Sequence, residues 1–160
     1  MKTQDEKPSW LQHFPIMFYT VVMGLGGLAL AYERLNLIFD ISGAVFEILR
    51  GAASLAYALI CACYATKLIR YPQACKAEFF HPVRVNFFAA FSIGTLLVAS
   101  LWRDFAPVYD ALFCAGTAFQ TFITLHVVSF WIKNNVQIAH SNPAWFIPIV
   151  GNLFVPLAAP

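Results

Sequence analysis

Charged side chains are scarce in this sequence, and they are almost absent from its long apolar runs. Only 11% of the 160 residues are charged, whereas 60% are hydrophobic; a soluble domain is about a quarter charged. The 16 phenylalanines outnumber the 8 acidic residues. A formal net charge of +2 is too small to indicate a nucleic-acid partner. The composition excludes an ordinary soluble domain and favours a chain buried in lipid.

Cysteine is also scarce, and the sequence lacks the patterns that metal or redox sites require. The four cysteines form no CxxC pair. Cys61, Cys63 and Cys114 lie inside apolar runs, where we interpret them as small hydrophobic residues rather than disulfide partners. No nucleophile stands near a base in the sequence, and no cluster of ligand residues indicates a metal. We therefore expect no enzyme activity, no metal and no cofactor.

The four histidines leave a membrane cytochrome as a minor alternative. A haem held between helices needs histidines at matched depth on neighbouring helices. Only His126 lies inside an apolar run, and His81 is the residue that could face the same leaflet. A histidine at the membrane interface is the more common interpretation of either residue.

Five apolar runs follow a short polar arm at residues 1–13. A helix rises about 1.5 Å per residue, so about 20 apolar residues cross a hydrocarbon core. Turns containing proline, asparagine or charged residues separate the runs. The prediction is an all-α polytopic membrane protein with about five transmembrane helices in hairpins. The expected spans are residues 14–32, 43–66, 83–102, 110–132 and 143–160.

The run from His81 to Trp102 carries a helix-start signal and a single charge. Proline at the first helical position loses no hydrogen bond, so His81-Pro82 indicates where this helix begins. Arg84 then lies in the first turn, where the helix dipole disfavours a cation. Lipid phosphates, a partner carboxylate or a bound anion must compensate for it. His81 and Arg84 are therefore our candidates for an anion-attracting mouth.

Basic residues gather on alternate connections, which predicts the orientation. If the N-terminus lies inside, only Arg34, Arg50 and Arg103 lie outside. Arg50 is also three residues from Glu47, a spacing that predicts an ion pair on one helix face. The expectation is a multi-pass protein of the cell (inner or plasma) membrane with a cytoplasmic N-terminus. The inside segments hold Lys2, Lys7, Lys67, Arg70, Lys76, Arg84 and Lys133.

Glycine and proline inside the spans are concentrated in the first, third and fifth runs. Irregular backbone at membrane depth is tolerated where it faces protein or a water-filled cavity. The odd-numbered spans are therefore predicted to form an inner layer along a pathway, although close helix packing is the simpler explanation of the glycines. A leucine should then be more damaging at Gly27 than at Gly116 on an outer span. The pore-lining candidates are Gly24, Gly27, Phe87, Phe88, Phe91, Pro148, Gly151 and Phe154.

Three segments resemble the tellurite-resistance and C4-dicarboxylate transporter family, which includes bacterial tellurite-resistance proteins and the slow anion channels of plant guard cells. They are HPVRVNFF at 81–88, PAWFIPIVGNLFVPLAAP at 143–160 and FYTVVMGLGGLALAY at 18–32. The resemblance implies a bundle of about ten helices around a pore. It also implies homo-oligomers, as trimers, that pass anions. The phenylalanine that plugs the bacterial pore lies on the ninth helix and has no counterpart here.

The resemblance covers nearly all of this chain but only the first half of such a bundle. The chain is expected to be a fragment, a truncated reading frame, or a half-size relative that must pair. The expected function is transport of small anions such as tellurite, C4-dicarboxylate, sulfite or halide. The lack of lysine or arginine deep in a span favours channel-like passage over a carrier. A non-conducting structural or regulatory membrane subunit is the alternative.

Overall fold

The described part of the chain, residues 10–40, 42–133 and 143–159 of a computed structural model, is helical and has no strand. Short 3-10 turns at Ile16–Phe18, Arg84–Phe87 and Pro143–Trp145 precede three of the α-helices. The all-α prediction is confirmed. The α-helices are α1 (Tyr19–Phe39), α2 (Ala44–Arg70), α3 (Pro72–Phe79), α4 (Phe88–Leu101), α5 (Ala106–Lys133) and α6 (Phe146–Ala158).

Four helical segments are long and apolar enough to cross a membrane, and a shorter apolar one follows. This confirms a polytopic membrane architecture with about five helices. The first helix continues to Phe39, beyond the predicted end at residue 32, because no glycine or proline lies between residue 32 and Asp40. Asp40 ends the helix in the left-handed conformation, with φ of 50°. The long segments are Ile16–Phe39, Ala44–Arg70, Arg84–Leu101 and Ala106–Lys133, and the shorter one is Pro143–Ala158.

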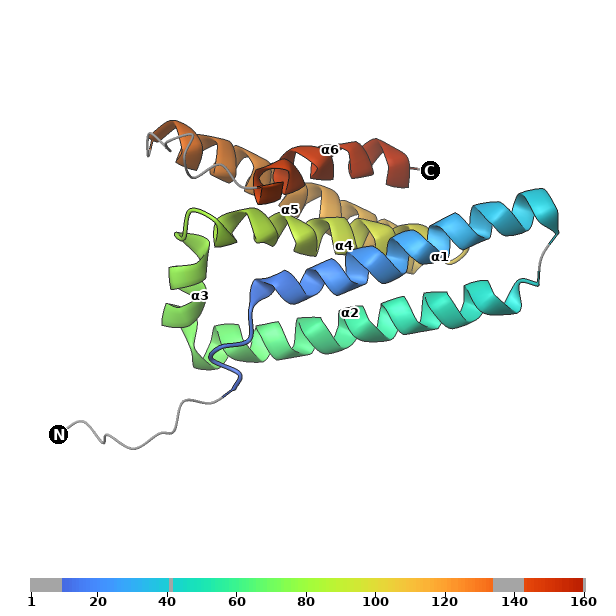
Figure 1. The fold of residues 1–160 in the computed structure, drawn as a ribbon, viewed down its shortest axis with the longest axis horizontal. Coiled ribbons are helices and arrows are strands. Elements are labelled where there is room, and N and C mark those ends of the chain that lie inside the picture. Colours follow the sequence, from blue (N-terminus) through green and yellow to red (C-terminus); the bar gives the residue numbers. More distant parts are fainter. Residues whose placement is uncertain (1–9, 41, 134–142, 160) are drawn as a thin grey trace.

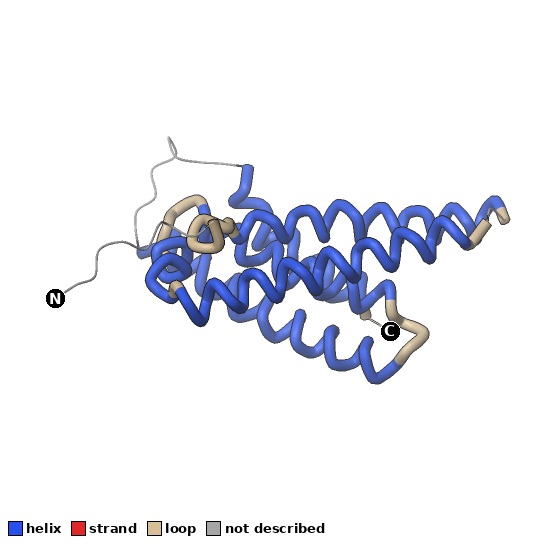
Figure 2. Tube along the Cα trace, turned by 90° about the horizontal axis from the view of Figure 1, so that it is seen from below, coloured by secondary structure: helices blue, strands red, loops and turns tan. Residues whose placement is uncertain are grey.

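Helix α4 lies at the centre of the bundle, with α1 and α2 on one side and α5 and α6 on the other (Figures 1 and 2). Within the most apolar 18-residue window of each long segment, 78% of the third segment is buried, whereas only 6% of α2 is buried. The first segment and α5 are nearly equal, at 28% and 22%. The third span is therefore the innermost of the four long ones, whereas burial hardly separates the first span from the fourth.

Glycines mark the closest approaches between helices, but the crowded glycines are not the ones that the sequence predicted. A Cβ on Gly116 of α5 would lie 3.0 Å from the side chain of Leu96 on α4, and one on Gly26 would lie 3.1 Å from Leu97. A Cβ on Gly27 would meet no heavy atom within 4 Å. For the packing of the described residues, the expectation that a leucine is more damaging at Gly27 than at Gly116 is therefore wrong, because Leu96 of α4 packs against Gly116 of α5.

The two ends of the bundle carry different charged groups. We call the end that contains α3, the start of α4 and the end of α2 the α3 end (Figure 1). At the opposite end, the predicted pair of Glu47 and Arg50 is formed, and Arg50 also lies over the Trp102 ring at 4.8 Å. The basic residues at the α3 end are Lys67, Arg70, Lys76, Arg84 and Lys133, and those at the opposite end are Arg34, Arg50 and Arg103. Lys2 and Lys7 lie outside the described residues.

Candidate functional site

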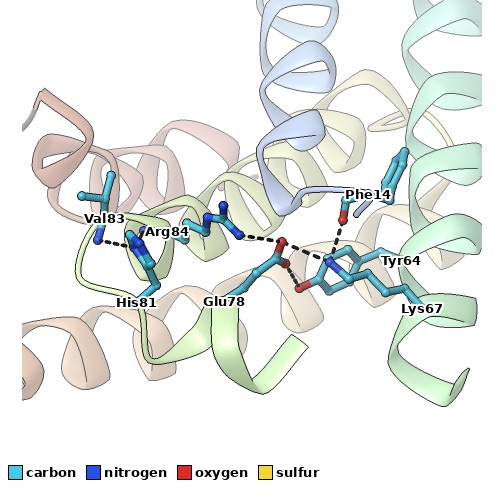
Figure 3. Close-up of polar contacts among 7 residues, drawn as sticks. All are labelled: Phe14, Tyr64, Lys67, Glu78, His81, Val83 and Arg84. Carbon is cyan, nitrogen blue, oxygen red and sulfur yellow. Dashed lines mark hydrogen bonds and ion pairs between the residues drawn. The ribbon is translucent and has the colours of Figure 1, made fainter. Parts of the chain in front are cut away.

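The α3 end contains a buried ion pair that joins three segments of the chain. Lys67 Nζ at the end of α2 lies 3.1 Å from Glu78 Oε1 of α3 and donates a 2.7 Å hydrogen bond to the Phe14 carbonyl (Figure 3). The Tyr64 hydroxyl donates to Glu78 Oε2 at 3.1 Å. The Lys67 and Glu78 side chains are only 1% and 5% exposed. Burying a charge is costly unless it is paired and hydrogen-bonded, and each of these charges has both kinds of partner.

Arg84 shares the same carboxylate from the solvent side. Its Nη1 lies 3.8 Å from Glu78 Oε1, and its side chain is 49% exposed. This contact is longer than the Lys67 contact and lies outside hydrogen-bond range. Two cations thus face one carboxylate, which leaves one positive charge in excess, and the exposed Arg84 presents it. Of the three compensating groups that the sequence left open, the structure supplies the carboxylate.

His81 organises the start of the third span. Its Nδ1 accepts hydrogen bonds from the backbone N–H groups of Val83 and Arg84 at 3.2 and 3.3 Å. The buried Asn86 donates through Nδ2 to the Pro82 and Val83 carbonyls, both at 3.2 Å. Side chains that bond nearby backbone compete with regular helix, so the α-helix begins at Phe88 rather than near residue 83. His81 therefore positions Arg84 beside Glu78.

The two glycine candidates of the first span lie on an open face of α1. Gly24 and Gly27 are both exposed, and a Cβ on either would meet no heavy atom within 4 Å. Ala31 continues this face toward the opposite end, where it lines a cavity. The face is free to border a pathway or another helix, and its role as a pore lining stays a prediction.

Pro148 and Gly151 are buried against Gln120 of α5, a residue that the sequence analysis did not select. Gln120 Nε2 donates to the Pro148 carbonyl at 2.9 Å, and its Oε1 accepts from Ser92 Oγ at 2.5 Å. A Cβ on Gly151 would collide with the Gln120 amide. These contacts join α4, α5 and α6 at membrane depth, so Pro148 and Gly151 have a packing role in the structure. Thr124, four residues after Gln120, donates to Asn152 Oδ1 of α6 at 3.2 Å.

The phenylalanine candidates do not share one surface. Phe88 makes edge contacts with Tyr64 and Phe79, and Phe91 makes edge contacts with rings of α1 and α5. Both line an apolar cavity between α2 and α5. Phe87 is half-buried beside the same core, whereas Phe154 lies at the opposite end of the bundle. The structure therefore does not bring these four side chains together with the glycines of α1.

A polar cavity of about 300 Å³ lies at the end of the bundle opposite α3. It is bordered by α1, α4 and α6, the three odd-numbered spans of the sequence-based prediction. The charged residues that line it are Glu33 and Arg34 at the end of α1, and Arg103 and Asp104 after α4. Arg103 also donates to the Ala159 carbonyl at 3.3 Å. The sequence used these arginines only to assign topology, so the cavity between them was missed.

The charged side chains of the three odd-numbered spans thus lie at the two ends of the bundle. Among the described residues, no lysine or arginine lies in the middle of a spanning helix. Long apolar helices with charges confined to their ends define a multi-pass membrane protein. An excess of positive charge at one end, with no charged site in the middle, is typical of proteins that attract anions but do not bind them tightly.

Residues 13–160 match the voltage-dependent anion channel family, and the chain belongs to that family. It is 30% identical over 142 residues to the tellurite resistance protein TehA homolog of Haemophilus influenzae. The aligned residues make up 88% of this chain and 43% of that protein. It is 27% identical over 161 residues to the guard cell S-type anion channel SLAC1 of Arabidopsis thaliana, covering 93% of this chain and 29% of the relative.

A third relative is the uncharacterized transporter MJ0762 of Methanocaldococcus jannaschii, 27% identical over 161 residues, with 94% of this chain and 45% of the relative covered. The chain therefore spans less than half the length of these three curated relatives. The family resemblance seen in the sequence is confirmed, and so is its extent, which is nearly all of this chain but less than half of each of these relatives.

Proposed function

We propose that this chain forms part of the wall of a pathway for small anions across a cell membrane, and that its role is transport rather than catalysis. The observation that carries the proposal is the excess positive charge at the α3 end, where Lys67 and Arg84 face the single carboxylate of Glu78 (Figure 3). The names of the plant relative, an anion channel, and of the bacterial relative, a tellurite resistance protein, support the same class of substrate.

Arg84 acts by raising the local concentration of anions rather than by holding one tightly. The Glu78 carboxylate lies 3.8 Å from its guanidinium and competes with an arriving anion for it. A cationic opening that binds weakly attracts ions without trapping them, which conduction requires. At the opposite end, Arg34 and Arg103 line the polar cavity together with Glu33 and Asp104, so the formal charge of that cavity is balanced.

The finer features of the proposal concern orientation, assembly and substrate. The α3 end faces the cytoplasm, because it carries most of the basic residues. The pathway is completed by further helices, either from the rest of a longer chain or from other copies in a homo-oligomer, which is a trimer in the family that the sequence resembles. The permeant ion is one of the small anions named above, and passage is channel-like.

The test is anion efflux from liposomes that contain the completed assembly. Arg84→Gln is expected to lower the rate at low salt and to have little effect at high salt, because the screening length falls from about 10 Å at 0.1 M to about 3 Å at 1 M. Arg84→Lys should restore most of the rate, because it keeps the charge. Arg70→Gln removes another exposed cation of the α3 end and is the matched control.

An equal effect of Arg84→Gln at every salt concentration, or an equal effect of Arg70→Gln, would contradict the role of Arg84. Liposomes that hold only this chain distinguish the two forms of assembly. We expect no efflux from them, because five helices leave the inner layer open to lipid on one side. Efflux there would mean that copies of this chain close a pathway among themselves.

A non-conducting structural or regulatory subunit is the second candidate, and the burial of α4 favours it. Every residue of α4 from Ser92 to Ala99 is buried among the other described helices. The described helices alone thus bury this part of the innermost helix. If the assembly folds in liposomes but no anion tested crosses, with or without a membrane potential, this second candidate is the better one.

A further inference from the structure

A cavity of about 580 Å³ lies outside the candidate anion site, between α2 and α5. The largest part of its wall comes from α2, whose apolar window is only 6% buried among the described residues. Phe119 of α5 lines it as well, and so do Ile16 and Tyr19 of the first segment. Its floor is formed by Phe88 and Phe91 of the central helix, and α3 closes one end. We call this cavity the α2–α5 groove, and among the residues of α2 that line it are Tyr57, Cys61, Ala65 and Leu68.

The tyrosine hydroxyl groups that line the α2–α5 groove already make hydrogen bonds within the protein. The Tyr19 hydroxyl donates to Cys61 Sγ at 3.4 Å, the Tyr57 hydroxyl is 2.8 Å from Thr95 Oγ1, and Tyr64 donates to Glu78. The rings therefore present apolar surface, and a polar ligand would lose its hydrogen bonds to water without replacement. A buried water also needs two to four polar partners. The chemistry of the groove fits a hydrocarbon chain.

The length and position of the groove match one leaflet of the membrane. From Tyr57 to Leu68, α2 rises about 16 Å at 1.5 Å per residue, close to half of the roughly 30 Å of a hydrocarbon core. The groove ends at α3, where the exposed Lys76 lines its rim. The nearby Glu78 carboxylate is covered by Lys67 and Arg84. A negatively charged head group at this rim thus meets cations rather than an open carboxylate.

We propose that the α2–α5 groove binds one acyl chain of an anionic glycerophospholipid from the leaflet at the α3 end, with the lipid phosphate at Lys76. A lipid in this position would pack against Tyr64 and Phe88, which border the buried Lys67–Glu78 pair. It would therefore hold the α3 end in place from the lipid side. The proposal does not depend on anion transport, so it can fail or succeed independently of the proposed function.

Photolabelling in nanodiscs tests the position of the acyl chain. The chain is embedded in phosphatidylcholine with a minor share of phosphatidylglycerol that carries a diazirine on its acyl chain, and labelled peptides are mapped by mass spectrometry. We expect stronger labelling at Cys61 and Phe119 than at Leu59 and Leu125, which are exposed but do not line the groove. Equal labelling at all four positions would overturn the proposal, because it would indicate only the surrounding bilayer.

A pair of matched variants tests whether the groove itself binds the lipid. Ala65→Phe places a ring inside the groove, whereas Ala62→Phe adds the same ring to exposed α2 surface outside it. Because both positions are exposed, neither change disturbs the buried core. We expect Ala65→Phe to reduce labelling of Cys61 several-fold and Ala62→Phe to leave it unchanged. Equal responses of the two variants would overturn a groove-bound lipid.

The head group is tested by changing Lys76 and the probe lipid. Lys76→Gln is expected to lower the preference for phosphatidylglycerol over phosphatidylcholine about fivefold, the contribution of one basic residue near a membrane surface. An unchanged preference would overturn the role of Lys76. Finally, a benzophenone amino acid at Ala65 is expected to cross-link to lipid. Cross-links to a second protein chain instead would show that protein covers the groove and would overturn the proposal.

Discussion

Removing the Glu78 carboxylate is expected to destabilise this protein much more than removing that of Glu47, although both form ion pairs. In Glu78→Gln, the Lys67 ammonium loses a carboxylate at 3.1 Å and keeps its hydrogen bond to the Phe14 carbonyl. Breaking a buried pair from one side costs about 3–5 kcal/mol, because the remaining charge stays in a poorly solvated site. Glutamine still accepts from Tyr64, so we expect about 3 kcal/mol, roughly a hundredfold loss in the folding equilibrium.

The matched control is Glu47→Gln. The Glu47 side chain is 56% exposed and pairs with Arg50 within one helix, an arrangement that contributes only about 0.3–0.5 kcal/mol. Both variants are titrated with sodium dodecyl sulfate in dodecyl maltoside micelles, and loss of helix is followed by far-UV circular dichroism. Equal shifts of the two unfolding midpoints would refute the inference that the Glu78 pair is buried and costly to break.

Substituting Lys67 and substituting Glu78 should lower the stability of the protein by different amounts, and this difference provides an internal check. Lys67→Met leaves Glu78 with Arg84 at 3.8 Å and with the Tyr64 hydroxyl, so it should cost less than Glu78→Gln. Combining the two substitutions removes both buried charges, and apolar replacement of a buried pair is often neutral. The double variant should therefore be more stable than Glu78→Gln alone, and the double-mutant cycle gives the coupling. A double variant whose loss equals the sum of the single losses would show that the two groups do not interact.

Three further predictions follow from single positions. Gly116→Leu should lower the yield of folded protein in detergent, because overpacking costs about 1–3 kcal/mol, whereas Gly27→Leu should not; equal yields would contradict the packing described above. A membrane-impermeant maleimide should label Lys76→Cys only from the cytoplasmic face and Asp104→Cys only from outside, and the reverse pattern would invert the topology. Burial raises the pKa of the Cys75 thiol, so the thiolate is depleted and Cys75 should react more slowly at neutral pH than in the unfolded chain; equal rates would contradict its burial.

The class of the protein could be predicted from the sequence because it depends on local properties. Apolar runs long enough to span a bilayer must be helical, since lipid offers no partners for backbone hydrogen bonds. The pair of Glu47 and Arg50 was equally predictable, because a spacing of three residues fixes both side chains on one helix face. The family resemblance rested on short motifs that stand directly in the chain, and the match over residues 13–160 agrees with it.

The buried pair at the α3 end could not be predicted in this way. Lys67 and Glu78 lie on different helices, and their contact depends on how α3 folds back against α2. In the sequence, Lys67 is one more basic residue near a membrane surface, and such residues are usually solvated. Gln120 was missed for a related reason, because its importance depends on the approach of Gly151 from α6.

The sequence thus determined by itself that the chain is helical, crosses a membrane several times and carries most of its basic residues on one side. Only the tertiary structure decided which helix is central, which glycines are crowded, and which charges are buried. The physical reason is the solvent. Lipid is as apolar as a protein core, so hydrophobicity cannot mark the buried face of a membrane helix as it does for a helix in water. Burial at Gly116 rather than at Gly27 was settled by the way α4 packs against its neighbours.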